Sequence, residues 1–506
     1  MELLSFYAIS VGGILAVLVF RRIAPFVTQL VDQLGTFFWR YFVYPYFVNR
    51  HRLCGPWSRA NVILCCSYAV IQIFFISFQA HDIEMAGRRA GTLSVIHMAL
   101  LIPMNHLSFF ANITGVSLVV FRRIHRVAGL MTAVLLCFHI ILLMSNKEKP
   151  WNLSHGGNLF ALLVLIPRSA GSIAAVALVV FSISFIRRRW FEIFIRSHQC
   201  LAALFVYSTL RHLPSKAVDS RIYIYVSLGV LATTTSVQAV LFLFRNRIFT
   251  AKFHPRALIT CERTESGPNN MGQEGKPLKI RIVLPRPLRV KAGQYVNIWL
   301  PTVSIMSWTQ THPFMVTSWS PEKQDVLELF VESRRGITKT LHARACFEGS
   351  SSYSAFIGGP YGASKSMNDF ECVLAIATDF GISGIISYLK KLIYGYNTST
   401  SYVRRVHFVW QVQSLGEKFS FSNLDSINYV EIARASESLL NDLLADDLPE
   451  NGYFNSPKEA FGIRAPIYNG EPDYESIVSE ESTGVKIPRV TNTKEEQGKT
   501  LVLGKT

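Results

Sequence analysis

The stretch from Arg122 to His139, RRIHRVAGLMTAVLLCFH, and the stretch from His198 to His212, HQCLAALFVYSTLRH, decide the fold. Each carries two histidines that are fourteen positions apart, His125 with His139 and His198 with His212. At about 100° per residue, fourteen helical steps fall roughly 40° short of four turns, so both histidines of a pair face much the same way, about 21 Å apart along the axis. The spacing therefore predicts two helices that set four imidazoles at two levels.

Apolar runs of this kind fill the first half of the chain. Half of the 506 residues are hydrophobic, and they concentrate before Phe244. A helix needs about 20 apolar residues to cross roughly 30 Å of hydrocarbon. The segments that meet this length are 3–20, 60–80, 92–120, 125–145, 158–186, 197–213 and 221–244. Residues 1–247 are therefore predicted to form a multi-pass α-helical membrane domain of about seven helices.

The four histidines of the two repeated stretches favour a metal role over simple packing. One buried histidine is more often satisfied by a hydrogen bond between helices. His97 and His106, on another span, lack a matching pair, and we expect them to pack between helices or to support the ligand residues. Two spans with the same spacing are a different case, because polar side chains at this depth are costly and usually functional. Facing imidazoles can ligate a haem iron from both sides. The pattern predicts a bis-haem helical core, with an inner pair, His125 and His198, and an outer pair, His139 and His212.

The charge distribution orients these spans. The net charge of +17 does not indicate a nucleic-acid partner, because much of it flanks the apolar runs, as in Arg122–Arg126 and Arg187–Arg189. Such flanks mark loops on the cytosolic side of the lipid bilayer. The run 3–20 has its arginines after it, which favours an uncleaved anchor with the N-terminus outside. Seven spans then place loop 146–157 outside, where Asn152-Leu-Ser predicts N-glycosylation of Asn152.

The second half of the chain reads as a soluble module. Residues 279–284 alternate polar and apolar side chains with a period of two, as in a half-buried strand. Further on, a buried strand at 373–377, a helix at 382–392 and a strand at 406–410 give a βαβ unit, which is typical of nucleotide-binding domains. From Tyr453 the chain is polar.

Three motifs follow the paired histidines in a fixed order: Lys291-Ala-Gly-Gln-Tyr-Val296, His312-Pro-Phe-Met315 and Gly358-Gly-Pro-Tyr-Gly362. With the histidines they resemble fungal ferric-chelate reductases, members of the ferric reductase and NADPH oxidase superfamily, over residues 60–480. The resemblance implies a ferredoxin-reductase-like module after the membrane domain. This module comprises an antiparallel β-barrel FAD domain at 248–355 and a divergent α/β NADPH-binding domain at 356–506. The latter has a polar C-terminal tail and is expected to be incomplete at its C-terminus.

The resemblance also implies cofactor contacts. For FAD, the flavin ring and ribityl chain would be held by His312, Pro313, Phe314, Met315 and Thr317, and the pyrophosphate by Arg335, Gly336 and Thr338. For NADPH, the implied residues are Gly358, Gly359, Pro360, Tyr361, Gly362, Gly381 and Ile382. The family has Thr where Met315 stands, so that one hydroxyl contact to FAD is missing or comes from Thr317. No catalytic side chain is assigned, because the cofactors carry the chemistry.

The nucleotide-binding part departs from the family. The glycine-rich loop reads Thr378-Asp-Phe-Gly-Ile382, which brings the charge of Asp379 close to phosphates, and Glu471 stands where the family often has Arg. No cysteine follows Cys372, so the family's Cys-Gly-Pro segment is absent. These departures put NADPH use in question.

The resemblance implies an NADPH-dependent ferric-chelate reductase of the plasma membrane. Electrons would pass from NADPH through FAD and two b-type haems to ferric or cupric chelates outside, and the protein would serve an iron-uptake permease/oxidase system. Two alternatives stay open. A superoxide-generating NADPH oxidase has the same order of motifs and differs in its acceptor. A catalytically impaired haem membrane paralogue would fit the altered nucleotide loop. A transporter is disfavoured, because the second half is of flavin-binding type.

Overall fold

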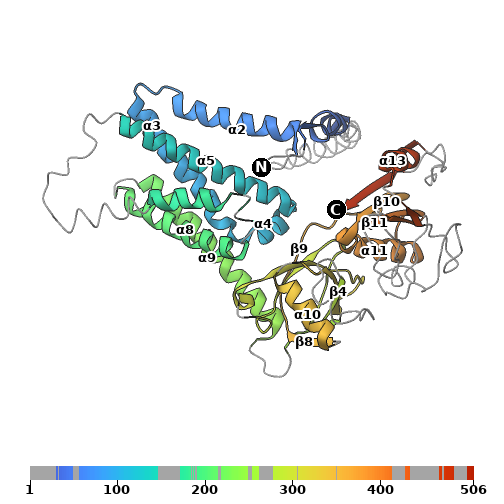
Figure 1. Ribbon diagram of the computed structural model, residues 1–506. Coiled ribbons are helices and arrows are strands. Elements are labelled where there is room, and N and C mark those ends of the chain that lie inside the picture. Colours follow the sequence, from blue (N-terminus) through green and yellow to red (C-terminus); the bar gives the residue numbers. More distant parts are fainter. Residues whose placement is uncertain are drawn as a thin grey trace, which may run out of the picture. The chain divides into compact units, whose positions relative to one another are not determined.

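The computed structural model describes much of the chain. Its described residues are 30–49, 56–145, 171–183, 191–214, 218–248, 254–260, 277–412, 428–432, 467–469, 472–483 and 499–505, with Phe185 and Arg187 and without Asp32, Ile305, Arg335 and Gly349. The chain divides into two compact units (Figure 1). The first unit contains residues 1–101 and 125–226, and the second contains residues 102–124 and 227–506.

The first unit is helical. Its long helices are α2 (Arg59–Ser77), α3 (Ile83–Leu101), α5 (Leu118–Ser145, in this unit from His125), α8 (Phe191–His212) and the start of α9 (Val218–Asn246); the short elements η1 (Trp39–Val43), β1 (Tyr46–Val48) and β2 (Trp57–Ser58) precede them. The Ser58 hydroxyl caps α2 by accepting a hydrogen bond from the Asn61 amide. Helices α3 and α5 are joined where the buried Ser94 hydroxyl donates to the Thr132 carbonyl, at 3.2 Å.

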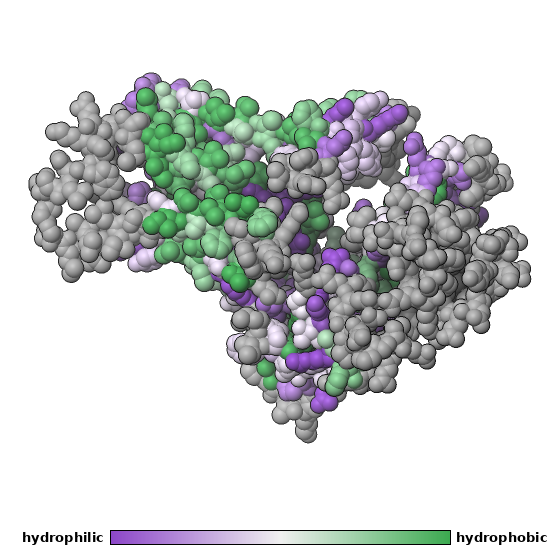
Figure 2. Space-filling view, viewed as in Figure 1, coloured by the Kyte–Doolittle hydropathy of each residue, from purple (hydrophilic) through white to green (hydrophobic). Residues whose placement is uncertain are grey.

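The outer surface of these helices is apolar. Ile63, Leu64, Val70 and Ile73 of α2 are all at least half exposed. Figure 2 shows hydrophobic residues gathered over α2, α3 and α5. A water-soluble protein rarely exposes so large an apolar surface, whereas lipid accommodates it. The chain is therefore a membrane protein.

Four of the described helices are long and apolar enough to cross a membrane: Arg59–Ser77, Ile83–Thr114, Leu118–Leu142 and Val218–Asn246. A shorter apolar helix covers Gly171–Phe181. Helix α8 is 22 residues long but carries charged residues within it, Arg196 and Arg211 among them. The predicted span 3–20 and the first part of 158–186 lie outside the described residues. The predicted total of seven spans stays a prediction.

The boundaries of the predicted spans 92–120 and 125–145 differ from the structure. The chain forms α3, a 3₁₀ segment η2 (Ile102–His106) and α4 (Leu107–Thr114), and α5 then begins at Leu118 rather than at 125. Gly115 ends α4 in the left-handed conformation, at φ +69°, which glycine adopts without steric cost. Hydrophobicity continues through this break, so a hydropathy pattern does not reveal it.

The second unit contains two antiparallel sheets that share one core. The strands are β3 (Arg256–Thr260), β4 (Pro277–Leu288), β5 (Tyr295–Trp299), β6 (His312–Met315), β7 (Gln324–Glu332), β8 (Ser350–Ser354) and β9 (Phe356–Tyr361), with α10 (Ile337–Glu348) before β8 and the 3₁₀ segment η4 (Met306–Thr309) before β6. The sheet orders are β7-β4-β3-β8 and β6-β5-β9. Alternate residues of each strand point into the core, among them Ile259, Ile280, Ile298 and Leu329. This is the antiparallel flavin-domain fold that the sequence predicted.

A mixed sheet follows, with strand order β13-β12-β11-β10-β14. Its elements are β10 (Cys372–Thr378), the 3₁₀ segment η5 (Asp379–Gly384), α11 (Ile386–Asn397), β11 (Arg405–Val412), β12 (Asn428–Ile432), β13 (Ile467–Asn469), α13 (Tyr474–Thr483) and β14 (Thr500–Lys505). Strands β10 and β11 are parallel and are connected through α11, which confirms the predicted βαβ unit. The helix begins at Ile386 rather than at 382, because the turn after β10 is 3₁₀.

The polar C-terminal region contributes to this sheet. Strand β14 lies parallel to β10, with Leu503 opposite Ala375, and Leu501 and Leu503 pack against the core. The predicted polar tail thus contains an integral strand. Four apolar or small residues, Leu501-Val-Leu-Gly504, carry too short a signal to be distinguished from a chance run in a polar segment.

Candidate cofactor sites and their relatives

The structure brings the four membrane histidines together in the two predicted pairs. The ring centres of His125 and His198 are 6.2 Å apart, and those of His139 and His212 are 6.5 Å apart. Helix α5 carries one histidine of each pair and α8 the other. Because each helix carries its two histidines at the same spacing, the two pairs lie at different levels of the first unit.

His139 has a fixed orientation. Its Nδ1 donates a hydrogen bond to the carbonyl of Gly87 on α3, at 2.7 Å, and this leaves Nε2 as the nitrogen able to bind a metal. Gly91, one turn further along α3, allows the ring to lie there, since a Cβ on Gly91 would be 2.7 Å from His139 Nδ1. Sequence reasoning assigned neither glycine, although the Gly-xxx-Gly spacing is visible in the chain.

The inner pair lacks such support from the protein. The Nδ1 atoms of His125 and His198 are buried and have no hydrogen-bond partner within the described residues. A buried polar atom without a partner is costly and calls for a ligand or solvent that completes it. The two histidines without a matching pair have partners within the protein: His97 donates from Nδ1 to the Leu93 carbonyl at 2.7 Å, and His106 Nε2 hydrogen-bonds with the Thr235 hydroxyl at 2.9 Å.

The geometry of both pairs fits an iron held between two imidazoles. A metal–imidazole bond of about 2 Å on each side, plus about 1 Å from nitrogen to ring centre, separates the two ring centres by roughly 6 Å. A metal ion without a macrocycle needs three or more protein ligands, and the described residues contain no cluster of three His, Cys, Asp or Glu side chains. A haem iron needs only two axial ligands from the protein. The four histidines therefore suit haem better than a bare ion.

The predicted flavin motif lies on β6, an edge strand of the β6-β5-β9 sheet. His312, Pro313, Phe314 and Met315 form β6, which pairs with β5 so that Ile298 is opposite His312 and Tyr295 is opposite Met315. Thr317 follows in the chain but is buried, and both its amide and its hydroxyl donate to the Glu328 carbonyl, each at 2.9 Å. The Thr317 hydroxyl thus already has a protein partner.

The predicted pyrophosphate residues lie at the start of α10. Gly336 has φ +84° directly before the helix, and the Thr338 hydroxyl accepts from the Arg334 amide at 3.0 Å. The first amides of a helix point outward and favour an anion. Arg335 lies outside the described residues. The position of Gly336 and Thr338 is compatible with a phosphate at this helix terminus.

The Gly-Gly-Pro-Tyr-Gly motif lies in strand β9 and directly after it. Residues 358–361 belong to β9, which pairs with β5 in the same sheet as the flavin motif. The predicted domain boundary at 355/356 therefore falls before a strand of the flavin fold. Gly359 and Gly362 have φ of +105° and +108°, which explains why glycine stands at both positions.

The Lys-Ala-Gly-Gln-Tyr motif connects the flavin fold to the mixed sheet. Gly293 has φ +78°, its amide donates to the Ser387 hydroxyl at 2.9 Å, and a Cβ there would clash with the Tyr388 ring. Gln294 donates to the Gly362 carbonyl at 3.0 Å. The motif acts as a structural joint between β5 and the start of α11.

The loop after β10 contains Gly381 and Ile382. Ile382 is fully buried in the core of the mixed sheet, and Asp379 has φ +45° with its carbonyl accepting from the Trp410 indole at 2.9 Å. Sequence reasoning expected a phosphate-binding turn at this point. The structure brings Gly381 and Ile382 to the carboxyl end of β10, where nucleotides bind in open α/β sheets.

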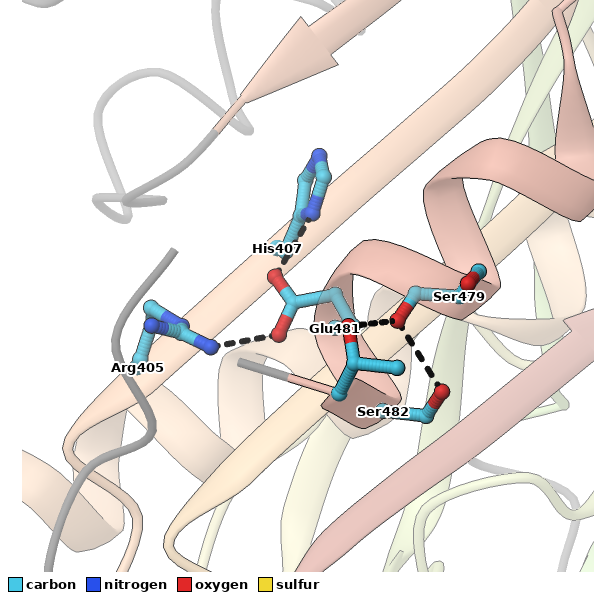
Figure 3. Close-up of polar contacts among 6 residues, drawn as sticks. Arg405, His407, Ser479, Glu481 and Ser482 are labelled. Atoms are coloured by element: carbon cyan, nitrogen blue, oxygen red, sulfur yellow. Dashed lines mark hydrogen bonds and ion pairs between the residues drawn. The ribbon is translucent and has the colours of Figure 1, made fainter. Parts of the chain in front are cut away.

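A buried polar cluster holds α13 on the mixed sheet (Figure 3). The Glu481 carboxylate accepts from His407 Nδ1 at 2.9 Å and from the Arg405 guanidinium, both on β11. Burial acts to raise the pKa of Glu481, but the hydrogen bond from His407 and the charge and hydrogen bond of Arg405 outweigh it and hold the pKa below its usual value. Sequence reasoning did not identify this cluster, because its members are 74 and 76 positions apart.

The fold and the sites define a membrane protein with a flavin-type module. In agreement with this class, residues 90–209 match the family Ferric reductase like transmembrane component, and residues 273–365 match the FAD-binding domain family. The chain thus combines a ferric-reductase-type membrane domain with an FAD-binding domain, and the predicted resemblance is confirmed.

Similar proteins include two from Saccharomyces cerevisiae. The chain is 24% identical to Ferric/cupric reductase transmembrane component 2 over 66% of its own length and 46% of the relative. It is 24% identical to Ferric reductase transmembrane component 3 over 76% of its own length and 54% of the relative. NADPH oxidase 1 of Mus musculus is 23% identical over 28% of this chain and 23% of that protein. The chain spans about half the length of these yeast relatives.

Proposed function

We propose that this chain is a transmembrane metalloreductase that passes electrons from NADPH through FAD and two b-type haems to ferric or cupric chelates. The observation that carries the proposal is the pair of facing histidines at each of two levels, with ring centres 6.2 and 6.5 Å apart. The resemblance to yeast ferric and cupric reductases supports the choice of acceptor.

His125 and His198 would hold the inner haem, and His139 and His212 the outer one. Haem held by two histidines supplies single-electron transfer without an open coordination position. The protein's part is to hold the ligands: Gly87 fixes the tautomer of His139, and Gly91 leaves room for its ring. The apolar exterior of α2, α3 and α5 keeps these sites within hydrocarbon, where small ions do not follow the electrons.

The FAD residues would be those of β6 and the start of α10. His312, Pro313, Phe314 and Met315 form an extended strand that would hold the flavin ring, and Gly336 and Thr338 lie at a helix start whose amides would face the pyrophosphate. Thr317, whose hydroxyl is held by Glu328, would shape the strand end rather than donate to FAD. Arg335 remains part of the proposal as a cation for the pyrophosphate.

For NADPH, the residues at the end of β10 are the stronger part of the predicted set. Gly381 and Ile382 lie in the 3₁₀ segment η5 that follows β10, whereas residues 358–361 lie within β9. The domain limits that we propose are 1–247 for the membrane domain, a flavin domain that includes β9, and a nucleotide-binding domain after it. A plasma-membrane location, glycosylation at Asn152 and service to an iron-uptake permease or oxidase follow from the same proposal and need their own tests.

The test is a pair of spectra and an acceptor assay on solubilised protein. A reduced-minus-oxidised spectrum with dithionite should show a b-type haem, and NADPH alone should reproduce it. Iron(II) trapped by a chelator should then form from a ferric chelate and persist in the presence of superoxide dismutase.

The alternatives predict other results. If superoxide dismutase abolishes iron reduction, the protein is a superoxide-generating oxidase. If dithionite reduces the haem and NADPH does not, it is a catalytically impaired paralogue. A protein without any haem signal would overturn the proposal.

A further inference from the structure

The last membrane helix covers the free edge of a sheet strand. Strand β9 lies at the edge of the β6-β5-β9 sheet, with β5 on one side. An edge strand presents unpaired N–H and C=O groups, which need partners when they are buried. Side chains from the end of α9 supply those partners, all within the second unit.

Asn246, the last residue of α9, pairs with the backbone of Ile357 as a neighbouring strand would. Its Oδ1 accepts from the Ile357 amide at 2.8 Å, and its Nδ2 donates to the Ile357 carbonyl at 3.0 Å. The same Nδ2 donates to the Phe242 carbonyl of the helix at 2.8 Å. Asn246 is 1% exposed, so removing its side chain takes away the partner of two backbone groups at a buried position, which is costly.

Arg245 and Gln238 continue the contact along β9. The Arg245 guanidinium donates to the Gly359 carbonyl, two residues beyond Ile357, and the Tyr361 hydroxyl donates to Gln238 Oε1 at 2.6 Å. Burial raises the pKa of Tyr361, and the charge of Arg245 offsets this only in part, so the phenol stays neutral and donates. Positions 357, 359 and 361 of the strand are therefore all bonded to one helix.

Aromatic packing supports the same contact. Phe242 of α9 lies against Trp299 of β5 and Phe356 of β9, with ring centres 6.2 Å apart in each case. Arg286 of β4 lies over the ring of Phe244, at 3.7 Å. The helix end thus packs against strands β4, β5 and β9 and is hydrogen-bonded to β9.

The sheet held in this way is the one that carries the flavin motif. Strand β5 lies between β9 and β6, and β6 contains His312, Pro313 and Phe314. Helix α9 is one element from Val218 to Asn246, and its residues from Ser227 on belong to the second unit. We propose that Arg245 and Asn246 are positioning residues that fix the flavin-motif sheet to the last membrane helix, and thereby set the rate of electron transfer from flavin to haem. This inference rests on the function proposed above.

The test compares Asn246→Ala, Asn246→Asp and Arg245→Ala with Arg247→Ala in the full-length solubilised protein. Arg247 is an exposed cation beside the same helix end, so its removal controls for loss of charge. Rapid mixing with NADPH follows flavin bleaching and haem reduction separately. We expect flavin reduction and the dithionite-reduced haem spectrum to match the wild type. Haem reduction by NADPH should slow by up to about 100-fold in Asn246→Ala, because small misplacements of reacting groups have effects of that order.

A second readout is hydrogen exchange at the Ile357 amide. It should speed up by roughly tenfold in Asn246→Ala, which removes its acceptor, and less in Asn246→Asp, which retains one. If Asn246→Ala loses FAD, Asn246→Asp and Arg245→Ala carry the kinetic test. Haem reduction in these variants equal to that of Arg247→Ala would overturn the positioning role. A wild type whose haem NADPH does not reduce would instead overturn the proposed function.

Discussion

Histidines of the mixed sheet and of the helical unit differ in what surrounds their buried ring nitrogens. His407, on the mixed sheet, donates from Nδ1 to the buried Glu481 carboxylate, which also accepts from Arg405. His125 and His198, in the helical unit, face each other with their Nδ1 atoms buried and without a partner in the described residues. Nδ1 of His407 is thus bonded within the protein, whereas Nδ1 of His125 and Nδ1 of His198 are not. A ring nitrogen bonded within the protein suits a structural role, and a facing pair whose buried nitrogens lack such a bond indicates a site for a ligand.

His139 lies between these cases. Its Nδ1 is satisfied by Gly87, while its other nitrogen is left for a metal, which is the arrangement that orients metal-bound histidines in general. The two membrane levels are thus built differently. Replacing single histidines and their neighbours tests whether a hydrogen-bond partner within the protein separates structural histidines from haem ligands.

The largest expected effect is on haem content. Replacing His125 or His198 by alanine should remove the inner haem, and with it about half of the b-type absorbance, because a bis-histidine iron loses one of its only two protein ligands. Pyridine haemochrome analysis of purified protein measures the content. The matched control is His97→Ala, a buried histidine that bonds to its own helix at Leu93. Unchanged haem in His125→Ala, or an equal loss in His97→Ala, would refute the ligand assignment.

The next effect is on stability, without any effect on haem. Glu481→Ala leaves Arg405 and His407 buried without their carboxylate, and breaking such a pair costs about 3–5 kcal/mol in free energy of unfolding. Urea unfolding followed by the fluorescence of Trp410, whose strand carries both residues, measures it. Glu475→Ala, at an exposed position of the same helix, is the control and should have little effect. Loss of haem in Glu481→Ala would show that the mixed sheet and the haem sites of the helical unit are not independent.

The sequence predicted the histidine pairs because a helix converts a repeated spacing into a shared direction, which needs no tertiary information. The βαβ unit was predictable for a similar reason, since Val373–Ala377 and Val406–Trp410 carry local strand signals. The supports were not predictable: Gly87 lies 52 positions from His139, and Asn246 lies 111 from Ile357. Such contacts depend on which elements pack together. The Gly-Gly-Pro-Tyr-Gly motif was read as a turn because its glycines suit one, whereas they serve the positive φ angles in and directly after an edge strand.

A smaller effect should appear at the outer level. Gly91→Ala places a methyl group 2.7 Å from His139 Nδ1, and overpacking of this kind costs about 1–3 kcal/mol. Because the ring must move, its hydrogen bond to Gly87 weakens, and we expect the outer haem to be lost in part or to change its midpoint potential. Redox titration of the two haems measures this. Gly129→Ala on α5, whose Cβ would meet nothing within 4 Å, is the control, and an equal change in both variants would contradict the assignment.

The smallest effect concerns the pH dependence of stability at Glu481. The pKa of Glu481 is lowered in the folded protein, despite burial, by the hydrogen bond from His407 and the charge and hydrogen bond of Arg405. A carboxyl with a depressed folded pKa stabilises the fold above its unfolded pKa, and this stabilisation is lost as pH falls through the folded pKa. The free energy of unfolding of the mixed sheet should therefore be level near neutrality and decline below about pH 4.3, the ordinary pKa of Glu.

The variant Glu481→Gln should lower the free energy of unfolding near neutrality and flatten its decline in acid, because glutamine has no charge to lose beside Arg405 and His407. Urea unfolding curves between neutral pH and the acid limit measure both slopes. If the free energy of unfolding of Glu481→Gln falls with pH as steeply as that of the wild type, other carboxyls cause the decline and Glu481 has no part in it.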